Sequence, residues 1–217
     1  MIWLNVSITN MGLFQRRDSF LKVVAQNARH WKVAGLVLAL SVVIACFGDT
    51  AREALKYDRL AILNGEYWRL VSAHFTHLGP THLLLNLAGL VLVWLLVGRY
   101  YSNRQWLFVL SVSIAAVSGG FWFFDPNMLW YVGLSGVLHG LLLAGAVRGL
   151  AILPSESAIL CVIVIGKLVY EQVAGPLPGS ESVSGGTVIV NAHLFGGVGG
   201  IVAAAVLWHR GRRDAPI

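Results

Sequence analysis

Two polar side chains in otherwise apolar stretches have complementary chemistry. Ser135 lies in a Gly-Leu-Ser-Gly stretch at positions 133–136, and His193 stands shortly before a glycine-rich run. A serine hydroxyl is a weak nucleophile until a neighbouring base accepts its proton, and a neutral imidazole suits that task near pH 7. We therefore predict that Ser135 is a nucleophile and that His193 is its general base.

A second polar pair, His82 and Asn86, is spaced to act on a single atom. Residues four apart lie on one face of a helix, so both side chains can converge on one oxygen. Hydrogen bonding between neighbouring helices is the alternative use of such side chains. His74 and His77 fall near the expected membrane interface, where they could anchor a loop.

The composition indicates that a membrane positions these residues. Of the 217 residues, 57% are hydrophobic and only 12% are charged, which is too apolar for a water-facing domain of this size. A helix needs about 20 apolar residues to cross a hydrocarbon core. We therefore predict an all-α membrane protein with six spans, at residues 32–49, 80–98, 105–124, 130–149, 156–174 and 187–208.

Positive charge predicts how these spans are oriented. Lys and Arg gather before the first span, between the second and third, after the fourth and after the sixth, whereas most acidic residues fall in the other connections. Positive residues are retained on the cytoplasmic side, so both termini are predicted to be cytoplasmic. The formal net charge of +6 then reflects topology, and no soluble surface remains for nucleic acid.

The chain is predicted to have three parts. A cytoplasmic lead occupies residues 1–31, the six-helix domain residues 32–208, and a short basic cytoplasmic tail residues 209–217. The outer connection at 50–79 mixes charges with large apolar side chains and is expected to be ordered at the interface. The connection at 175–186 is rich in Gly, Pro and Ser and is expected to be mobile.

The predicted orientation brings the polar residues to one depth. The second, fourth and sixth helices all run from outside to inside, and Asn86, Ser135 and His193 each lie about 8 to 9 Å from an outer helix end. Small residues four apart allow helix backbones to approach closely in lipid. Two such pairs are present, Gly136 with Gly140 and Gly196 with Gly200. Close approach of these helices would bring His193 within hydrogen-bond reach of Ser135.

Together these motifs are similar to those of the rhomboid intramembrane serine proteases. The resemblance covers residues 60–205 and rests on Gly133-Leu134-Ser135-Gly136, His82 with Asn86, His193 before its glycines, and Trp68-Arg69 in the outer connection. The compact six-helix form and the stretches 77–89 and 133–140 more narrowly resemble the rhombosortase branch.

The resemblance implies a mechanism without a cofactor, a metal ion or a third acidic residue. Ser135 would attack the scissile carbonyl, and His193 would act as general base and then as general acid. The oxyanion would be held beside Gly133 by the Ser135 backbone N–H with the side chains of His82 and Asn86. Supporting or packing roles are implied for Trp68, Arg69, His77, Gly136, His139, Gly196 and Gly200. Position 139 departs from the family pattern, because many rhomboids have an aromatic residue there behind the catalytic histidine.

The rhombosortase resemblance also implies a substrate class. The substrates would be exported proteins with a C-terminal sorting tail that comprises a Gly-Gly motif, a transmembrane helix and a basic end. Cleavage would take place within the lipid bilayer, at the periplasmic face of a bacterial inner membrane. Whether an accessory membrane protein takes part is left open.

Several alternatives remain open at this point. Ser135 could merely pack helices, His139 could compete as the base, and Lys167 could be the base of a Ser-Lys dyad unless it only snorkels near Glu171. The histidines raise the question of a zinc site, although no His-Glu-xx-His segment is present. The rival functions are a generic rhomboid protease, a rhomboid-fold protein that binds transmembrane clients without cleavage, and a small-molecule transporter. The transporter is disfavoured because charged intramembrane residues and paired broken helices are scarce.

Overall fold

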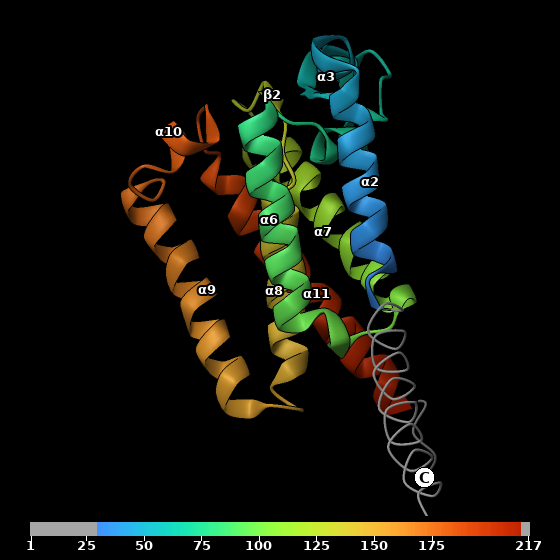
Figure 1. Ribbon diagram of the computed structural model, residues 1–217, viewed down its shortest axis with the longest axis vertical. Helices are drawn as coiled ribbons and strands as arrows, with labels where there is room; N and C mark the ends of the chain where they lie inside the picture. The colour runs from blue at the N-terminus through green and yellow to red at the C-terminus, as the bar shows by residue number, and fades with distance from the viewer. Residues whose placement is uncertain (1–29, 214–217) are drawn as a thin grey trace, which may run out of the picture.

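The computed structural model describes the backbone of residues 30–213 and the side chains of residues 30–210. Its helices and strands are, in chain order, α2 (Lys32–Cys46), α3 (Gly48–Leu55), β1 (Tyr57–Asp58), α4 (Arg59–Leu63), α5 (Arg69–Ser72), η1 (Ala73–Phe75), α6 (Pro80–Val97), η2 (Gly98–Tyr100), α7 (Asn103–Phe124), β2 (Trp130–Tyr131), α8 (Ser135–Gly149), α9 (Pro154–Ala174), α10 (Ser180–Ser184) and α11 (Val190–Arg213) (Figure 1). Most of the predicted lead at 1–31, and the end of the predicted tail at 209–217, lie outside the described residues.

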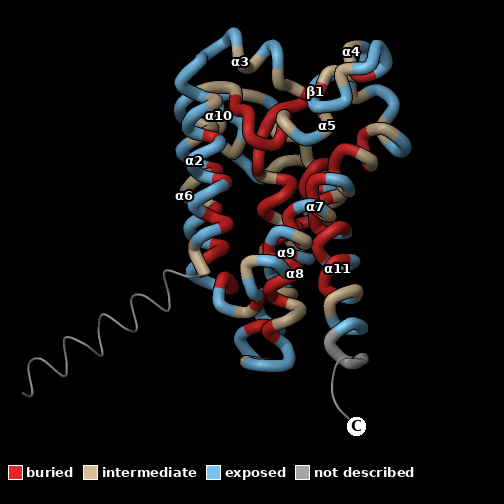
Figure 2. The backbone as a smooth tube through the Cα atoms, turned by 90° about the vertical axis from the view of Figure 1, so that its right-hand side faces the viewer, coloured by how far each residue is buried: buried red, intermediate tan, exposed pale blue. Residues whose placement is uncertain are grey.

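The centre of the molecule is formed by α8 and α11, which pack along each other and against α7. Glycines make this contact close. A Cβ atom on Gly196 would overlap the carbonyl of Gly136, and one on Gly200 would overlap the carbonyl of Gly140. Buried segments, red in Figure 2, are concentrated along these three helices. The spacing of small residues thus corresponds to two helices whose backbones touch.

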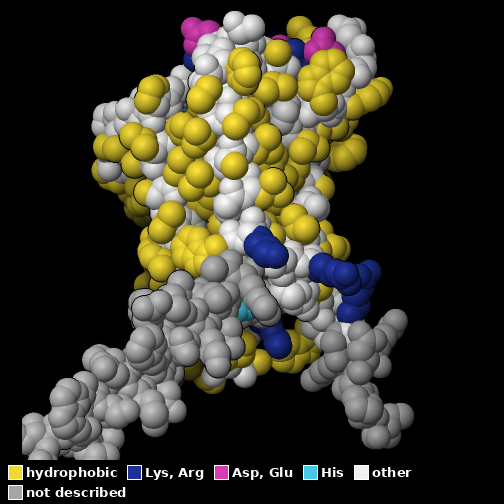
Figure 3. All heavy atoms as spheres, turned by 45° about the vertical axis from the view of Figure 1, so that its right-hand side comes forward, with side chains coloured by type: hydrophobic (Ala, Val, Ile, Leu, Met, Phe, Trp, Pro, Cys, Tyr) yellow, Lys and Arg dark blue, Asp and Glu magenta, His cyan; other side chains and the backbone are white. Residues whose placement is uncertain are grey.

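Four helical segments of the described chain are long and apolar enough to cross a membrane. They are Pro80–Tyr100, Asn103–Phe124, Pro154–Ala174 and Val190–Arg210. Helices α2 and α3 add a fifth if they are one span broken by a bend of 115°. Helix α8 has 15 residues and is buried among the others. These long apolar helices make the chain a multi-pass membrane protein, and hydrophobic side chains cover the middle of the face shown in Figure 3.

The fourth predicted span was placed too early in the chain. It was expected to begin at position 130, whereas α8 begins at Ser135. The preceding residues form β2, in which Tyr131 pairs with Tyr57 of β1. Gly133 then has a φ of +132°, a conformation that L side chains rarely adopt, and its N–H donates to the carbonyl of Ala73. The prediction failed because the pairing partner of β2 lies in the distant outer connection.

The outer connection at 50–79 is folded, as expected, and two of its residues hold it together. The Arg69 side chain is buried; its Nη1 donates to the carbonyl of Glu53 at 2.8 Å, and its Nε pairs with Glu66 at 2.7 Å. The Trp68 indole donates to the carbonyl of Ala54 at 3.2 Å. Trp68 and Arg69 therefore stabilise the connection and lie outside the chemistry of the site.

Helix α9 stands at the rim of the molecule, on the left in Figure 1. Its buried residues are Ser157, Val164, Leu168 and Glu171. The connection at 175–186 that follows, predicted to be mobile, contains the short helix α10. Glu171 is thus a buried acidic residue on a helix with few buried positions, so its contacts decide its role.

Candidate active site

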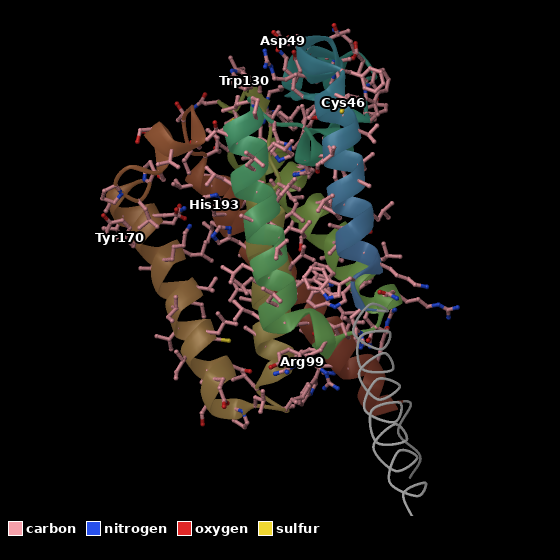
Figure 4. The ribbon with its side chains drawn as sticks, viewed as in Figure 1. Cys46, Asp49, Arg99, Trp130, Tyr170 and His193 are labelled. Atoms are coloured by element: carbon pink, nitrogen blue, oxygen red, sulfur yellow. The ribbon has the colours of Figure 1, made fainter. Side chains whose placement is uncertain are left out.

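Ser135 and His193 are brought together from two different helices. Ser135 is the first residue of α8, and His193 lies in the first turn of α11, where 5% of it is exposed. The distance from Ser135 Oγ to His193 Nε2 is 3.0 Å, which is a hydrogen bond. Figure 4 shows His193 between α9 and α6, in the half of the molecule nearer α3. The pair has the geometry of a hydroxyl nucleophile with its base.

The opposite nitrogen of the imidazole meets an acidic side chain. His193 Nδ1 lies 2.8 Å from Glu171 Oε2, and the other oxygen of Glu171 lies 2.7 Å from Lys167 Nζ. The family resemblance implies that no third acidic residue is used, yet the structure places the carboxylate of Glu171 against the imidazole. Snorkelling near Glu171 does not by itself account for Lys167, because its Nζ is paired with a carboxylate that is buried against His193.

The sequence did contain a signal for Glu171. Helix α9 ends on the side of the molecule where α11 begins, so a residue near the C-terminal end of α9 lies level with a residue near the start of α11 (Figure 1). Glu171 is three residues before the end of α9, and His193 is three residues after the start of α11. At about 1.5 Å per residue, each lies roughly 5 Å from the helix end on that side. The comparison of depth that relates the second, fourth and sixth helices therefore extends to the fifth.

His139 supports the imidazole of His193 by stacking. The two ring centroids are 4.3 Å apart with an interplanar angle of 24°. His139 Nδ1 bonds to the backbone carbonyl of Ser135 at 2.8 Å, whereas the Ser135 hydroxyl bonds to His193. His139 thus occupies the place expected for an aromatic ring, and its geometry favours this role over that of a competing base.

His82 and Asn86 line the same cavity as Ser135 and His193. This cavity has a volume of about 240 Å³. Asn86 Nδ2 donates to the carbonyl of His82 at 3.0 Å, so one N–H and the amide oxygen remain for other partners. The ring of His82 lies against Gly133, since a Cβ there would come within 3.0 Å of His82 Cε1. Within the described chain neither side chain bonds to Ser135.

A comparison with protein families decides the family. Residues 64–210 match the sequence model of the Rhomboid domain, and they make up more than half of the chain. This chain belongs to the rhomboid family. Its Ser135 and His193 both fall within the matched region.

Individual rhomboids show a similar relationship. Rhomboid protease GlpG of Klebsiella pneumoniae is 31% identical over 141 residues, which cover 62% of this chain and 49% of GlpG. The proposed rhomboid protease YdcA of Bacillus subtilis is 28% identical over 136 residues, which cover 59% of this chain and 66% of YdcA. The chain thus spans about half of one relative and about two thirds of the other.

The polar cluster of this rhomboid is a poor place for a metal ion. Ligand atoms of His139, Glu171 and His193 lie within 4.8 Å of one another, which is close enough for shared coordination. However, the Lys167 ammonium lies 2.7 Å from Glu171 and 3.5 Å from His193 Nδ1. A cation among these ligands would face that positive charge at short range. The arrangement favours proton transfer over metal binding.

Two histidines of the outer connection lie outside this proton-transfer chemistry. His74 Nε2 bonds to Ser118 Oγ at 2.9 Å, and burial lowers the pKa of His74 to about 4. His77 packs edge-on against His82, with ring centroids 5.2 Å apart. Burial, with a smaller contribution from His82, lowers the pKa of His77 to about 3. Both rings are therefore neutral near pH 7 and serve to pack the connection.

Proposed function

We propose that this rhomboid is an intramembrane serine endopeptidase in which Ser135 is the nucleophile and His193 the general base. The observation that carries the proposal is the 3.0 Å contact between Ser135 Oγ and His193 Nε2, beside a cavity within an otherwise apolar body. Water is needed for hydrolysis, and a polar cavity among membrane helices is where water can be held.

In the proposed reaction, His193 Nε2 takes the hydroxyl proton as Ser135 Oγ attacks the scissile carbonyl. The imidazolium then gives that proton to the leaving amine, and a water molecule repeats the sequence to release the acyl group. Ser135 begins α8, so its N–H has no partner within the helix and points, with the positive end of the helix dipole, toward developing negative charge. We assign the oxyanion to this N–H together with His82 and Asn86.

We propose six spans with both termini in the cytoplasm and a site that opens to the periplasmic side of a bacterial inner membrane. In Figure 3 Asp and Glu gather at the upper end of the molecule, and Lys and Arg lie mostly toward the lower end. Positive residues remain in the cytoplasm, so the upper end would face outward. The site would then lie in the outer half of the bilayer, because His193 is in the first turn of α11.

The proposed substrates are exported proteins whose C-terminal sorting tail contains a Gly-Gly motif, a transmembrane helix and a basic end. This proposal rests on the resemblance of residues 77–89 and 133–140 to the rhombosortase branch. A generic rhomboid protease that acts on other transmembrane helices is the alternative, and an accessory membrane protein is compatible with either.

Cleavage of a reporter with a Gly-Gly transmembrane tail tests the proposal. The reporter would be co-expressed with wild type, Ser135→Ala, His193→Ala and Lys167→Ala. We expect cleavage to fall to background for the first two variants and to remain measurable for the third. Ser111→Ala and His209→Ala, exposed and away from the cavity, are matched controls. Cleavage by Ser135→Ala would refute the site, and cleavage of a generic transmembrane substrate alone would refute the substrate class.

A further inference from the structure

The imidazole of His193 is held from the side that faces away from Ser135. Glu171 Oε2 lies 2.8 Å from His193 Nδ1, and Lys167 Nζ lies 3.5 Å from the same nitrogen. A nitrogen that donates its hydrogen to a carboxylate cannot also accept one from an ammonium. The shorter contact is the hydrogen bond, so Nδ1 carries the hydrogen and Nε2 presents its lone pair to Ser135 Oγ.

The three groups are buried to different degrees. Only 2% of the Glu171 side chain and 6% of the His193 side chain are exposed, against 28% of Lys167. A charged side chain inside a membrane protein is costly unless it is paired, and it most often marks a functional site. Lys167 lies one helical turn before Glu171 and binds its second oxygen, so the carboxylate is fixed at both oxygens.

We infer that Glu171 is a positioning residue for catalysis, held by Lys167, and that this rhomboid uses a Ser135–His193–Glu171 triad rather than a dyad. The inference rests on the proposed protease function. Glu171 accepts the Nδ1–H of His193 throughout, which fixes the tautomer and the ring plane. When Nε2 takes the Ser135 proton, the carboxylate stabilises the imidazolium that forms and does not itself become protonated.

The other neighbours of His193 do not offer a carboxylate to its Nδ1–H. From α8, His139 stacks on the ring face and bonds to the Ser135 carbonyl. From α6, His82 and Asn86 line the cavity that His193 shares with Ser135. Of the described residues that line the cavity, Glu171 is the one that carries negative charge.

Glu171→Gln tests the inference, because it keeps the shape of the side chain and removes its charge. The protein would be purified in detergent and assayed with a transmembrane substrate and with a fluorophosphonate probe that labels an activated serine. We expect kcat and the labelling rate to fall about 10²- to 10⁴-fold, with KM within about twofold of wild type. Glu171→Asp, which restores the charge on a shorter side chain, should recover part of the loss. A purely structural role would change folding without this recovery.

A second variant and a control keep the test decisive. If Glu171→Gln folds poorly because Lys167 is left unpaired, the double variant Lys167→Met/Glu171→Gln removes both charges and should fold while remaining slow. Glu156→Gln, exposed at the other end of α9, should match wild type. A folded Glu171 variant with wild-type kcat and a wild-type labelling rate would overturn the triad but leave the proposed protease function intact. A wild-type protein that neither cleaves nor labels would overturn the proposed function as well.

Discussion

Replacement of Gly136 by Ala should separate the nucleophile from its base by a calculable amount. A Cβ on Gly136 would lie 2.7 Å from the carbonyl oxygen of Ala192, and ordinary contacts begin at 3.4 Å. The backbones of α8 and α11 must therefore move apart by about 0.7 Å. If the movement is transmitted in full, the Ser135–His193 contact lengthens from 3.0 Å to about 3.7 Å, beyond hydrogen-bond range.

The expected consequence is a large loss of activity with a moderate loss of stability. A displacement near 1 Å at a reacting centre costs about 10²-fold in rate, and overpacking costs about 1–3 kcal/mol. The assay is kcat for a transmembrane substrate, together with thermal unfolding in detergent. Gly119→Ala is the matched control, because nothing lies within 4 Å of a Cβ there. Wild-type kcat in a folded Gly136→Ala protein would refute the argument that backbone contact sets the geometry of the site.

Three further predictions concern residues around the site. Arg69→Lys cannot reproduce the forked contacts of the guanidinium with the Glu53 carbonyl and the Glu66 carboxylate. The outer connection should therefore be cut faster in limited proteolysis, and the protein should lose about 1–3 kcal/mol of stability. Equal cutting rates would contradict this. His139→Phe should keep kcat within about threefold of wild type, because a ring still stacks on His193. His139→Ala removes the ring and should lower kcat about tenfold. Equal kcat values for the two variants would show that stacking is irrelevant. The folded-state pKa of His77 is about 3, below its unfolded value near 6.5, so stability should be lost as pH falls from 6.5 toward 3, by about 2 kcal/mol at pH 5. The His77→Phe variant should lose less stability over this range when melting is measured as a function of pH. An unchanged slope would assign the loss to other groups.

Much of the site could be predicted from the sequence because depth in a membrane is read directly from position along a helix. Ser135 and His193 lie on separate helices that run in the same direction, and glycine spacing indicated that those helices touch. The contact follows from these two local features.

The errors arose where a residue depends on a distant partner. Trp130 and Tyr131 look like the start of an apolar span, yet they pair with β1 in the outer connection. Glu171 looks like the partner of a nearby lysine. Its position near the end of α9 permits a contact with His193, but the packing of α9 against α8 and α11 is what brings its second oxygen there. Long-range pairing of this kind leaves no periodic signal in one segment of sequence.

The most direct test of the central claim is to identify the residue that a fluorophosphonate modifies in the purified protein. Mass spectrometry should find the adduct on Ser135 in wild type, with none on Ser111, an exposed serine whose hydroxyl bonds to the carbonyl of Leu107 in its own helix. Labelling should be lost in Ser135→Ala and strongly slowed in His193→Ala. An adduct that forms equally fast without His193, or that forms on another serine, would contradict the proposal that these two residues are a nucleophile and its base.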